Sequence, residues 1–216
     1  MYQNILFDLD GTLTDSAPGI IRSVDYALEK LGQKVPEGTN MNAFIGPPLK
    51  VSFQTICGMS PDEAAHAVDV YRERYNTVGL FENRVYPGIM ELLTRLKADG
   101  FTIGLATAKP EVTSVRIMEH FGLAPYFTVM AGASLDESRP QKADVIAYAM
   151  SRLPGANTGN TVMIGDRDQD ALGAAQNGIP CIGVLYGYGS PEELTGAGAS
   201  LLARDTDDLY RLLTAE

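Results

Sequence analysis

The stretch of sequence that decides the fold is residues 4–12, which read NILFDLDGT. Its apolar start is typical of a strand buried on both faces of a sheet, and we expect that strand over residues 4–9. Asp8 and Asp10 stand at its end, and residues i and i+2 of an extended chain face the same side. Gly11 follows, where the chain can turn sharply or approach a ligand closely. The stretch therefore predicts a buried strand that presents two carboxylates to one space.

The rest of the chain alternates between strand and helix patterns, with one interruption. Short apolar runs predict further strands at residues 101–106, 127–130, 161–164 and 181–185. Apolar residues at helical spacing predict helices at residues 18–31, 89–96, 112–121, 143–153 and 171–177. From about residue 34 to residue 80 the sequence contains no pattern of a buried strand, only helical pieces at 49–56 and 61–75.

This order of elements predicts an α/β fold, in which a parallel sheet carries helices on both faces. We expect the sheet domain to consist of residues 1–15 and 83–216, and an inserted all-helical domain to span residues 16–82. Right-handed crossovers place the carboxyl ends of all the strands at one edge of the sheet, where ligands bind in such folds.

The composition narrows the classes of partner. The 216 residues include 17 Lys and Arg and 27 Asp and Glu, for a formal net charge of −10. No basic run could follow a phosphate backbone or an anionic lipid surface, so we expect no nucleic-acid and no membrane partner. No apolar stretch reaches the roughly 18–20 residues that cross a bilayer. The first residues lack the basic region of a signal peptide, and Cys57 and Cys181 are isolated, so we expect a cytoplasmic protein.

Polar residues follow three of the predicted strands. Asp8 and Asp10 end the first strand, Thr107 ends the second, and Asp166 and Asp170 follow the fourth. In a parallel sheet these positions meet at one edge, and four carboxylates in one crevice need a cation or raised pKa values. Oxygen ligands without a nearby His or Cys favour Mg²⁺. Each motif alone also fits an ordinary turn or helix cap, but the set together favours a functional site.

At this point the residues resemble the four motifs of the haloacid dehalogenase superfamily, in order and in spacing. The matching segments are FDLDGTL at 7–13, TAK at 107–109, Lys142, and GDRDQD at 165–170. The helical insert resembles the cap of the phosphoglycolate phosphatase-like and bacterial 5′-nucleotidase-like branch, and FIGPPL at 44–49 resembles a cap loop of that branch. The resemblance implies a Rossmann-like core with a mobile helical cap.

The resemblance also implies a role for each motif residue. Asp8 is the nucleophile that becomes an aspartyl-phosphate, and Asp10 protonates the leaving oxygen and then activates water. Thr107 donates to the phosphoryl oxygens, and Lys142 offsets charge beside Asp8. The implied ligands of Mg²⁺ are Asp8, the carbonyl oxygen of Asp10 and Asp166, with support from Asp170.

Two departures from the family pattern leave alternatives open. The third motif often reads Lys-Pro, whereas Ala143 follows Lys142 here, and Arg139 with its following proline lies three residues upstream. Arg139 therefore stays an alternative to Lys142 as the cation of this motif. The second motif commonly has Asn where Ala108 stands, so some phosphate contact falls to backbone N–H groups there.

Four residues are candidate contacts to the substrate: Gly11, Ala108, Gly46 and Lys50. Lys50 follows the turn that contains Gly46, and the start of a solvated helix is an equally good interpretation of it. Lys109 is interpreted as structural, and residues 187–190, which read GYGS, as a turn at the rim of the sheet.

We therefore predict a Mg²⁺-dependent phosphatase that hydrolyses small phosphomonoesters, such as phosphoglycolate or nucleoside and sugar monophosphates. The alternatives are a phosphomutase on the same scaffold and a non-catalytic phosphate-binding regulatory module. A dehalogenase has no use for Asp10 or for Mg²⁺. We expect a small-molecule substrate as the partner, and a monomer or weak homodimer as the oligomeric state.

Overall fold

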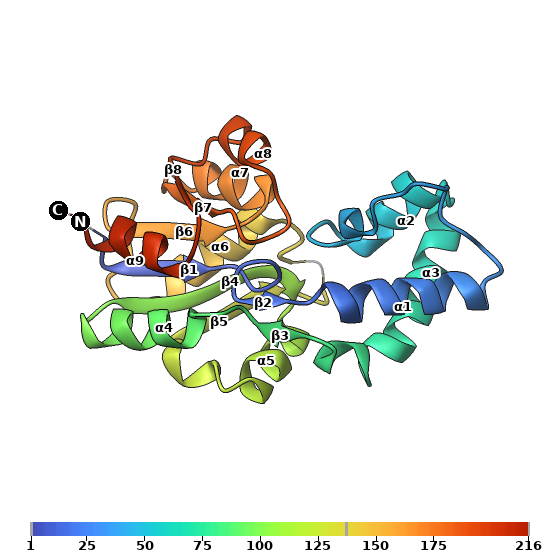
Figure 1. Ribbon diagram of the computed structural model, residues 1–216, viewed down its shortest axis with the longest axis horizontal. Helices are drawn as coiled ribbons and strands as arrows, with labels where there is room; N and C mark the ends of the chain where they lie inside the picture. Colours follow the sequence, from blue (N-terminus) through green and yellow to red (C-terminus); the bar gives the residue numbers. More distant parts are fainter. Residues whose placement is uncertain (1, 137, 216) are drawn as a thin grey trace. The chain divides into compact units, whose positions relative to one another are not determined.

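The computed structural model describes residues 2–136 and 138–215, and the chain divides into two compact units (Figure 1). The core unit consists of Met1–Asp15 and Val85–Glu216, and the helical unit consists of Ser16–Arg84. Within the described residues, no helix has both the length and the apolar character that a membrane crossing requires.

The core unit is built on a six-stranded sheet in which every neighbouring pair is parallel. This confirms the predicted α/β fold. The spatial order is β5-β4-β1-β6-β7-β8, so that β1 lies in the interior between β4 and β6. The strands are β1 (Asn4–Phe7), β4 (Thr102–Pro110), β5 (Val129–Ala133), β6 (Thr161–Gly165), β7 (Cys181–Val184) and β8 (Leu201–Ala203).

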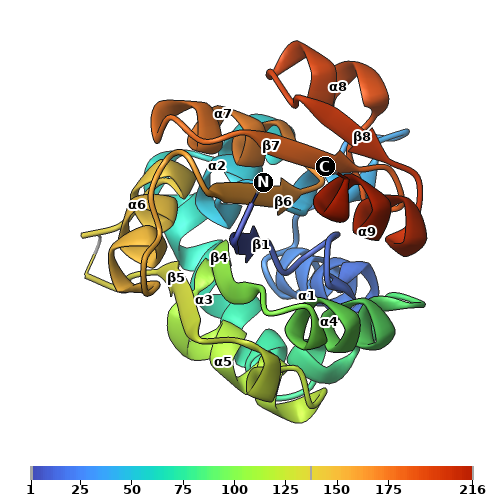
Figure 2. The same cartoon turned by 90° about the vertical axis from the view of Figure 1, so that its left-hand side faces the viewer.

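Helices cover both faces of this sheet (Figure 2). On one face, α6 and α7 pack in a single apolar cluster against strand residues such as Leu6, Ala106 and Met163. On the other face lie α4 and α9, which contact each other, while α5 packs against β4 and β5. The helices are α4 (Ile89–Ala98), α5 (Glu111–His120), α6 (Lys142–Arg152), α7 (Asp168–Gln176), α8 (Pro191–Gly196) and α9 (Thr206–Thr214), with a 3₁₀ turn η3 (Ala124–Tyr126).

The helical unit has its own apolar core. Helix α1 packs against α3, and α3 packs against α2. Phe44 at the end of η1 and Phe53 of α2 are in edge-to-face contact. Both rings are fully buried. The elements are α1 (Ala17–Lys30), η1 (Met41–Phe44), α2 (Leu49–Cys57), α3 (Pro61–Tyr75) and η2 (Gly79–Phe81). A second, two-stranded sheet consists of β2 (Thr14–Asp15) and β3 (Arg84–Val85), and three of these four residues belong to the core unit.

The register of the central strands brings three segments to one edge. Phe7, the last residue of β1, is level with Leu105 on β4 and with Ile164 on β6. The residues that follow these positions therefore lie next to one another at the carboxyl end of β1, although β4 itself continues to Pro110 and β6 to Gly165. From β1 the strand order continues to β4 and β5 on one side of the sheet and to β6, β7 and β8 on the other. The direction of succession therefore reverses next to β1, which makes this edge a topological switch point.

Candidate active site

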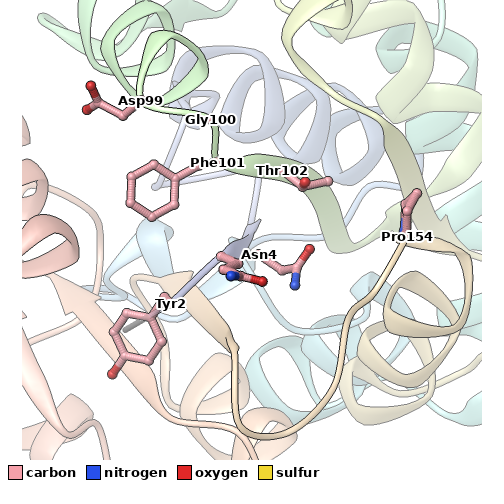
Figure 3. A pocket seen from close by; sticks show the side chains of 8 residues that line it. Tyr2, Asn4, Asp99, Gly100, Phe101, Thr102 and Pro154 are labelled. Atoms are coloured by element: carbon pink, nitrogen blue, oxygen red, sulfur yellow. The ribbon is translucent and has the colours of Figure 1, made fainter.

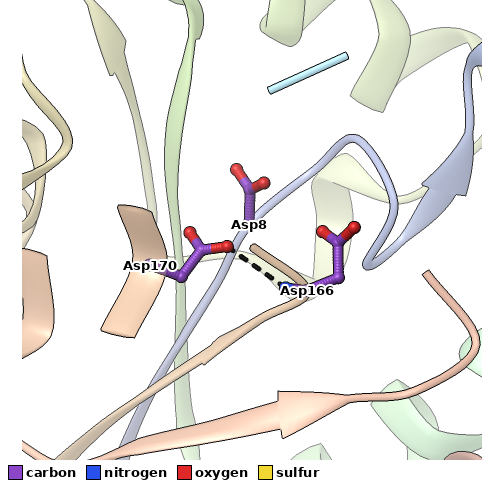
Figure 4. Close-up of side chains that lie close together, drawn as sticks. All are labelled: Asp8, Asp166 and Asp170. Atoms are coloured by element: carbon purple, nitrogen blue, oxygen red, sulfur yellow. Dashed lines mark hydrogen bonds between the residues drawn. The ribbon is translucent and has the colours of Figure 1, made fainter. Parts of the chain in front are cut away.

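Three buried carboxylates meet at this edge. Asp8 follows β1, Asp166 follows β6, and Asp170 lies in the first turn of α7. One carboxylate oxygen from each lies within 4.8 Å of the others, and the three side chains converge in Figure 4. Three acids that are distant in the sequence therefore form one group that could hold a metal ion.

Asp166 is held rigidly by two donors. The Thr12 hydroxyl donates to its Oδ1 over 3.1 Å, and the backbone N–H of Tyr188 donates to its Oδ2 over 2.8 Å. Complete burial raises the pKa of Asp166 well above its usual range, and the carboxylates of Asp170 and Asp8 raise it further. A nearby cation would offset this cost of ionisation.

Asp170 has a different set of partners for each of its oxygens. Its Oδ2 accepts the backbone N–H groups of Asp166 and Arg167, each over 3.1 Å, which closes the first turn of α7 (Figure 4). Its Oδ1 lies 2.7 Å from the ammonium of Lys142. Burial raises the pKa of Asp170 to about 6, although Lys142 opposes the shift. Asp170 therefore caps its helix and also lines the acidic group.

Lys142, at the start of α6, is the cation beside Asp8. Its Nζ lies 2.7 Å from Oδ1 of Asp8 and 2.7 Å from Oδ1 of Asp170, in a buried position. Burial disfavours the charge, but the two carboxylates outweigh it and raise the pKa of Lys142. Arg139, the alternative from the sequence, instead pairs with Glu111 over 2.9 Å. The geometry thus brings Lys142 to Asp8.

Asp10 and Thr107 lie at the same edge with Lys109. The ammonium of Lys109 is 2.6 Å from Oδ2 of Asp10, while Oδ1 of Asp10 is buried and has no hydrogen-bond partner among the described residues. Thr107 is buried, and its hydroxyl oxygen accepts the backbone N–H of Lys109 over 3.3 Å. Its own hydroxyl hydrogen can therefore point to a ligand. Ala108 lies between these two residues.

Two glycines let the backbone approach Asp166. Gly11 has a φ of +85°, and a Cβ built there would overlap the Asp166 carboxylate. A Cβ on Gly187 would overlap both the side chain of Asp166 and the carbonyl oxygen of Gly11. The segment 187–190, interpreted from the sequence as a rim turn, therefore packs directly on the acidic group. The spacing of Gly187 and Gly189 beyond a strand was the available signal for this close approach.

The other two candidate contacts to a substrate belong to the helical unit. Gly46 has a φ of +103°, and Lys50 is exposed on α2. Their assignment as substrate contacts stays a prediction.

The charges at the edge fit a divalent cation. Asp8, Asp166 and Asp170 would carry three negative charges if all were ionised, and Lys142 offsets one of them. The remaining two match the charge of Mg²⁺, and carboxylate oxygens are the ligands that this ion prefers. The family resemblance implies the carbonyl oxygen of Asp10 as the ligand from that residue, and the Asp10 carboxylate has its Oδ2 at the Lys109 ammonium.

A pocket of about 330 Å³ lies elsewhere on the core unit (Figure 3). It is lined by residues at the starts of β1 and β4, among them Asn4 and Thr102. It therefore lies at the amino ends of the strands, opposite to the carboxylates.

Comparisons with known proteins agree with this geometry. The family model described as haloacid dehalogenase-like hydrolase matches residues 5–184. The chain is 46% identical over 193 residues to a 5′-nucleotidase of Pseudomonas aeruginosa, which covers 89% of this chain and 87% of that protein. It is 43% identical over 214 residues to the tyrosine-protein kinase PtkA of Mycobacterium tuberculosis, which covers 98% of this chain and 72% of that protein. The crystal structure of a predicted phosphatase from Clostridium acetobutylicum superposes with a TM-score of 0.93 and 46% identity, covering 99% and 98% of the two chains.

Proposed function

The chain belongs to the haloacid dehalogenase-like hydrolase family and is a phosphoric monoester hydrolase, and we propose that it releases phosphate from small phosphomonoesters with Mg²⁺, through an aspartyl-phosphate on Asp8. One observation carries the proposal. A buried carboxylate at the carboxyl end of β1 lies against the Lys142 ammonium and within 4.8 Å of two further acids. Phosphoryl transfer depends mainly on such positioning and on stabilisation of charge.

In the first step, the Asp8 carboxylate attacks phosphorus and the bond from phosphorus to the leaving oxygen breaks. Asp10 gives its proton to that oxygen, which leaves as an alcohol. The ammonium of Lys142, 2.7 Å from Asp8, offsets the negative charge that the phosphoryl group brings. The Thr107 hydroxyl donates to a phosphoryl oxygen, and the backbone N–H of Ala108 adds a second donor.

In the second step, water attacks the phosphorus of the aspartyl-phosphate. Asp10, now a carboxylate, takes a proton from this water, so that phosphate leaves and Asp8 returns to its starting form. The same residue thus serves as acid and then as base. This is consistent with a side chain that has one oxygen held by Lys109 and the other without a hydrogen-bond partner among residues 2–136 and 138–215.

The residues proposed to hold Mg²⁺ are Asp8, Asp166 and the carbonyl oxygen of Asp10, with Asp170 in support. The burial of the acids and the raised pKa values of Asp166 and Asp170 support the presence of a cation. When bound, the ion would supply the positive charge that lets a phosphate dianion approach carboxylates.

The substrate is proposed to be a small phosphomonoester selected by the helical unit, which would act as a cap with Gly46 and Lys50 at its contact loop. The relative named 5′-nucleotidase supports nucleoside monophosphates within this class. Phosphoglycolate and sugar phosphates belong to the same proposed class of substrates, because each carries a phosphate dianion on an alkyl oxygen.

The test is a panel of phosphoglycolate, glucose 6-phosphate and AMP, incubated with the protein and Mg²⁺. We expect the phosphate released into solution to equal the ester consumed. Recovery of an isomerised ester would identify a mutase, and phosphate found on tyrosine residues would identify the transfer that the name of the mycobacterial relative describes. Absence of turnover on all three esters and on p-nitrophenyl phosphate would favour the regulatory module.

Gly187→Ala is expected to lower kcat/KM by about 10-fold or more, because a Cβ there overlaps Asp166 and displaces a side chain that must be placed within fractions of an ångström. The measurement is phosphate release, together with the midpoint of thermal unfolding. Gly196→Ala in α8 is the matched control, since a Cβ at that position contacts nothing within 4 Å. Equal activity of the two variants would show that the 187–190 segment tolerates displacement.

A further inference from the structure

We propose that Lys109 is a positioning residue for Asp10: it holds one carboxylate oxygen so that the other faces the leaving group. The two side chains form an ion pair of 2.6 Å, with only 7% of the Lys109 side chain and 12% of the Asp10 side chain exposed. The inference rests on the proposed function, in which Asp10 is the acid. It replaces the interpretation of Lys109 as merely structural.

A local irregularity of β4 brings Lys109 to Asp10. The pairing of β4 with β5 shifts between Thr107 and Pro110, where three steps along β4 match one step along β5. Ala108 and Lys109 therefore form a bulge, and bulges re-aim side chains next to active sites. Gly132 of β5 accommodates it, since a Cβ there would lie 2.6 Å from the Lys109 carbonyl oxygen.

The two lysines of the site contact different acids of the site in the described ion pairs. The ammonium of Lys142 contacts Asp8 and Asp170, whereas the ammonium of Lys109 contacts Asp10. Lys109 also donates its backbone N–H to the hydroxyl oxygen of Thr107. A single residue thus orients both a phosphate donor and the acid.

The contact fixes the orientation of the Asp10 carboxylate. Oδ2 accepts from the Lys109 ammonium over 2.6 Å, so this oxygen is held on the side of Lys109. Oδ1, the buried oxygen that accepts no hydrogen bond from the described residues, is therefore the oxygen left to face a leaving group. Without the ammonium, the carboxyl group could rotate and present the wrong oxygen to the leaving group.

The experiment compares substrates that do and do not need a proton on the leaving group. Nitrophenolate leaves p-nitrophenyl phosphate unprotonated, whereas the alkyl oxygen of the best ester in the panel must be protonated. Because kcat/KM reports only steps up to the first irreversible one, it includes the donation of this proton and excludes the later hydrolysis of the aspartyl-phosphate. Lys109→Met and Lys109→Gln remove the ammonium, Lys109→Arg keeps a cation, and Lys97→Met, at an exposed site on α4, is the control.

We expect Lys109→Met and Lys109→Gln to lower kcat/KM for the alkyl ester by about 10- to 100-fold, which is part of the roughly 10²- to 10⁴-fold that general acid catalysis contributes. For p-nitrophenyl phosphate the expected loss is less than about threefold. Lys109→Arg should recover part of the loss, and Lys97→Met should match the parent. Equal losses on both substrates, no loss on either, or a change in KM alone would overturn the inference. Thermal unfolding of each variant shows whether it folds. If Lys109→Met or Lys109→Gln does not fold, the test rests on the other of these two.

Asp10→Asn, measured on the same two substrates, distinguishes failure of the role of Lys109 from failure of the proposed function, in which Asp10 is the acid. If the loss of kcat/KM caused by Asp10→Asn depends on the leaving group, while the loss caused by Lys109→Met does not, only the proposed role of Lys109 fails. If Asp10→Asn itself shows no such dependence, the assignment of Asp10 as the acid fails, and the inference falls with it.

Discussion

Asp8→Asn is expected to lower phosphate release by at least about 1,000-fold, because a neutral amide cannot replace the carboxylate that attacks phosphorus. Asparagine has nearly the same shape as aspartate, and it can still accept from Lys142, which lies 2.7 Å away. The fold should therefore survive the change. The measurement is the initial rate with p-nitrophenyl phosphate, together with circular dichroism and the midpoint of thermal unfolding.

Asp25→Asn is the matched control, since it makes the same substitution at an exposed position of α1. Its rate should equal that of the parent. An Asp8→Asn protein that folds and keeps half of the parental rate would remove Asp8 as the nucleophile, and the aspartyl-phosphate would then have to form elsewhere or not at all.

Removal of divalent cations with EDTA is expected to lower the rate to about 1% or less, and added Mg²⁺ in excess of the chelator should restore it. The physical reason is the buried group of Asp8, Asp166 and Asp170, whose mutual repulsion opposes the approach of a phosphate dianion. The measurement is p-nitrophenyl phosphate turnover before chelation, after it and after the addition of Mg²⁺. Full activity in EDTA would contradict the proposed metal site.

Cation binding should also be visible without turnover. A ligand that binds only the folded state raises the midpoint of thermal unfolding, so Mg²⁺ should raise that midpoint. Burial and mutual repulsion raise the pKa of Asp166, and burial raises that of Asp170 to about 6, so protons compete with the cation as the pH falls. The shift caused by Mg²⁺ should therefore be larger at pH 7 than at pH 5. An Asp166→Asn variant should lose most of the shift.

Most of the core could be predicted because its parallel strands are buried on both faces and read as apolar runs. The prediction for residues 4–9 found β1, and the runs at 161–164 and 181–185 found β6 and β7 to within a residue or two. The sequence analysis did not predict β8 or α9. Strand β8 has only three residues, and one of them, Leu201, is exposed, so it forms no recognisable apolar run. The bulge that extends β4 to Pro110 also has no signature in apolar spacing.

The sequence by itself determined the α/β fold and which acids would gather, because parallel connections force every strand to end at the same edge. Only the tertiary structure decided between Lys142 and Arg139, since three residues of separation at the start of a helix do not say which side chain reaches Asp8. It also decided the partners of Asp10 and Asp166. A strand bulge and a backbone N–H create those contacts; apolar spacing does not reveal the bulge, and the glycines at 187 and 189 do not say which backbone N–H meets Asp166.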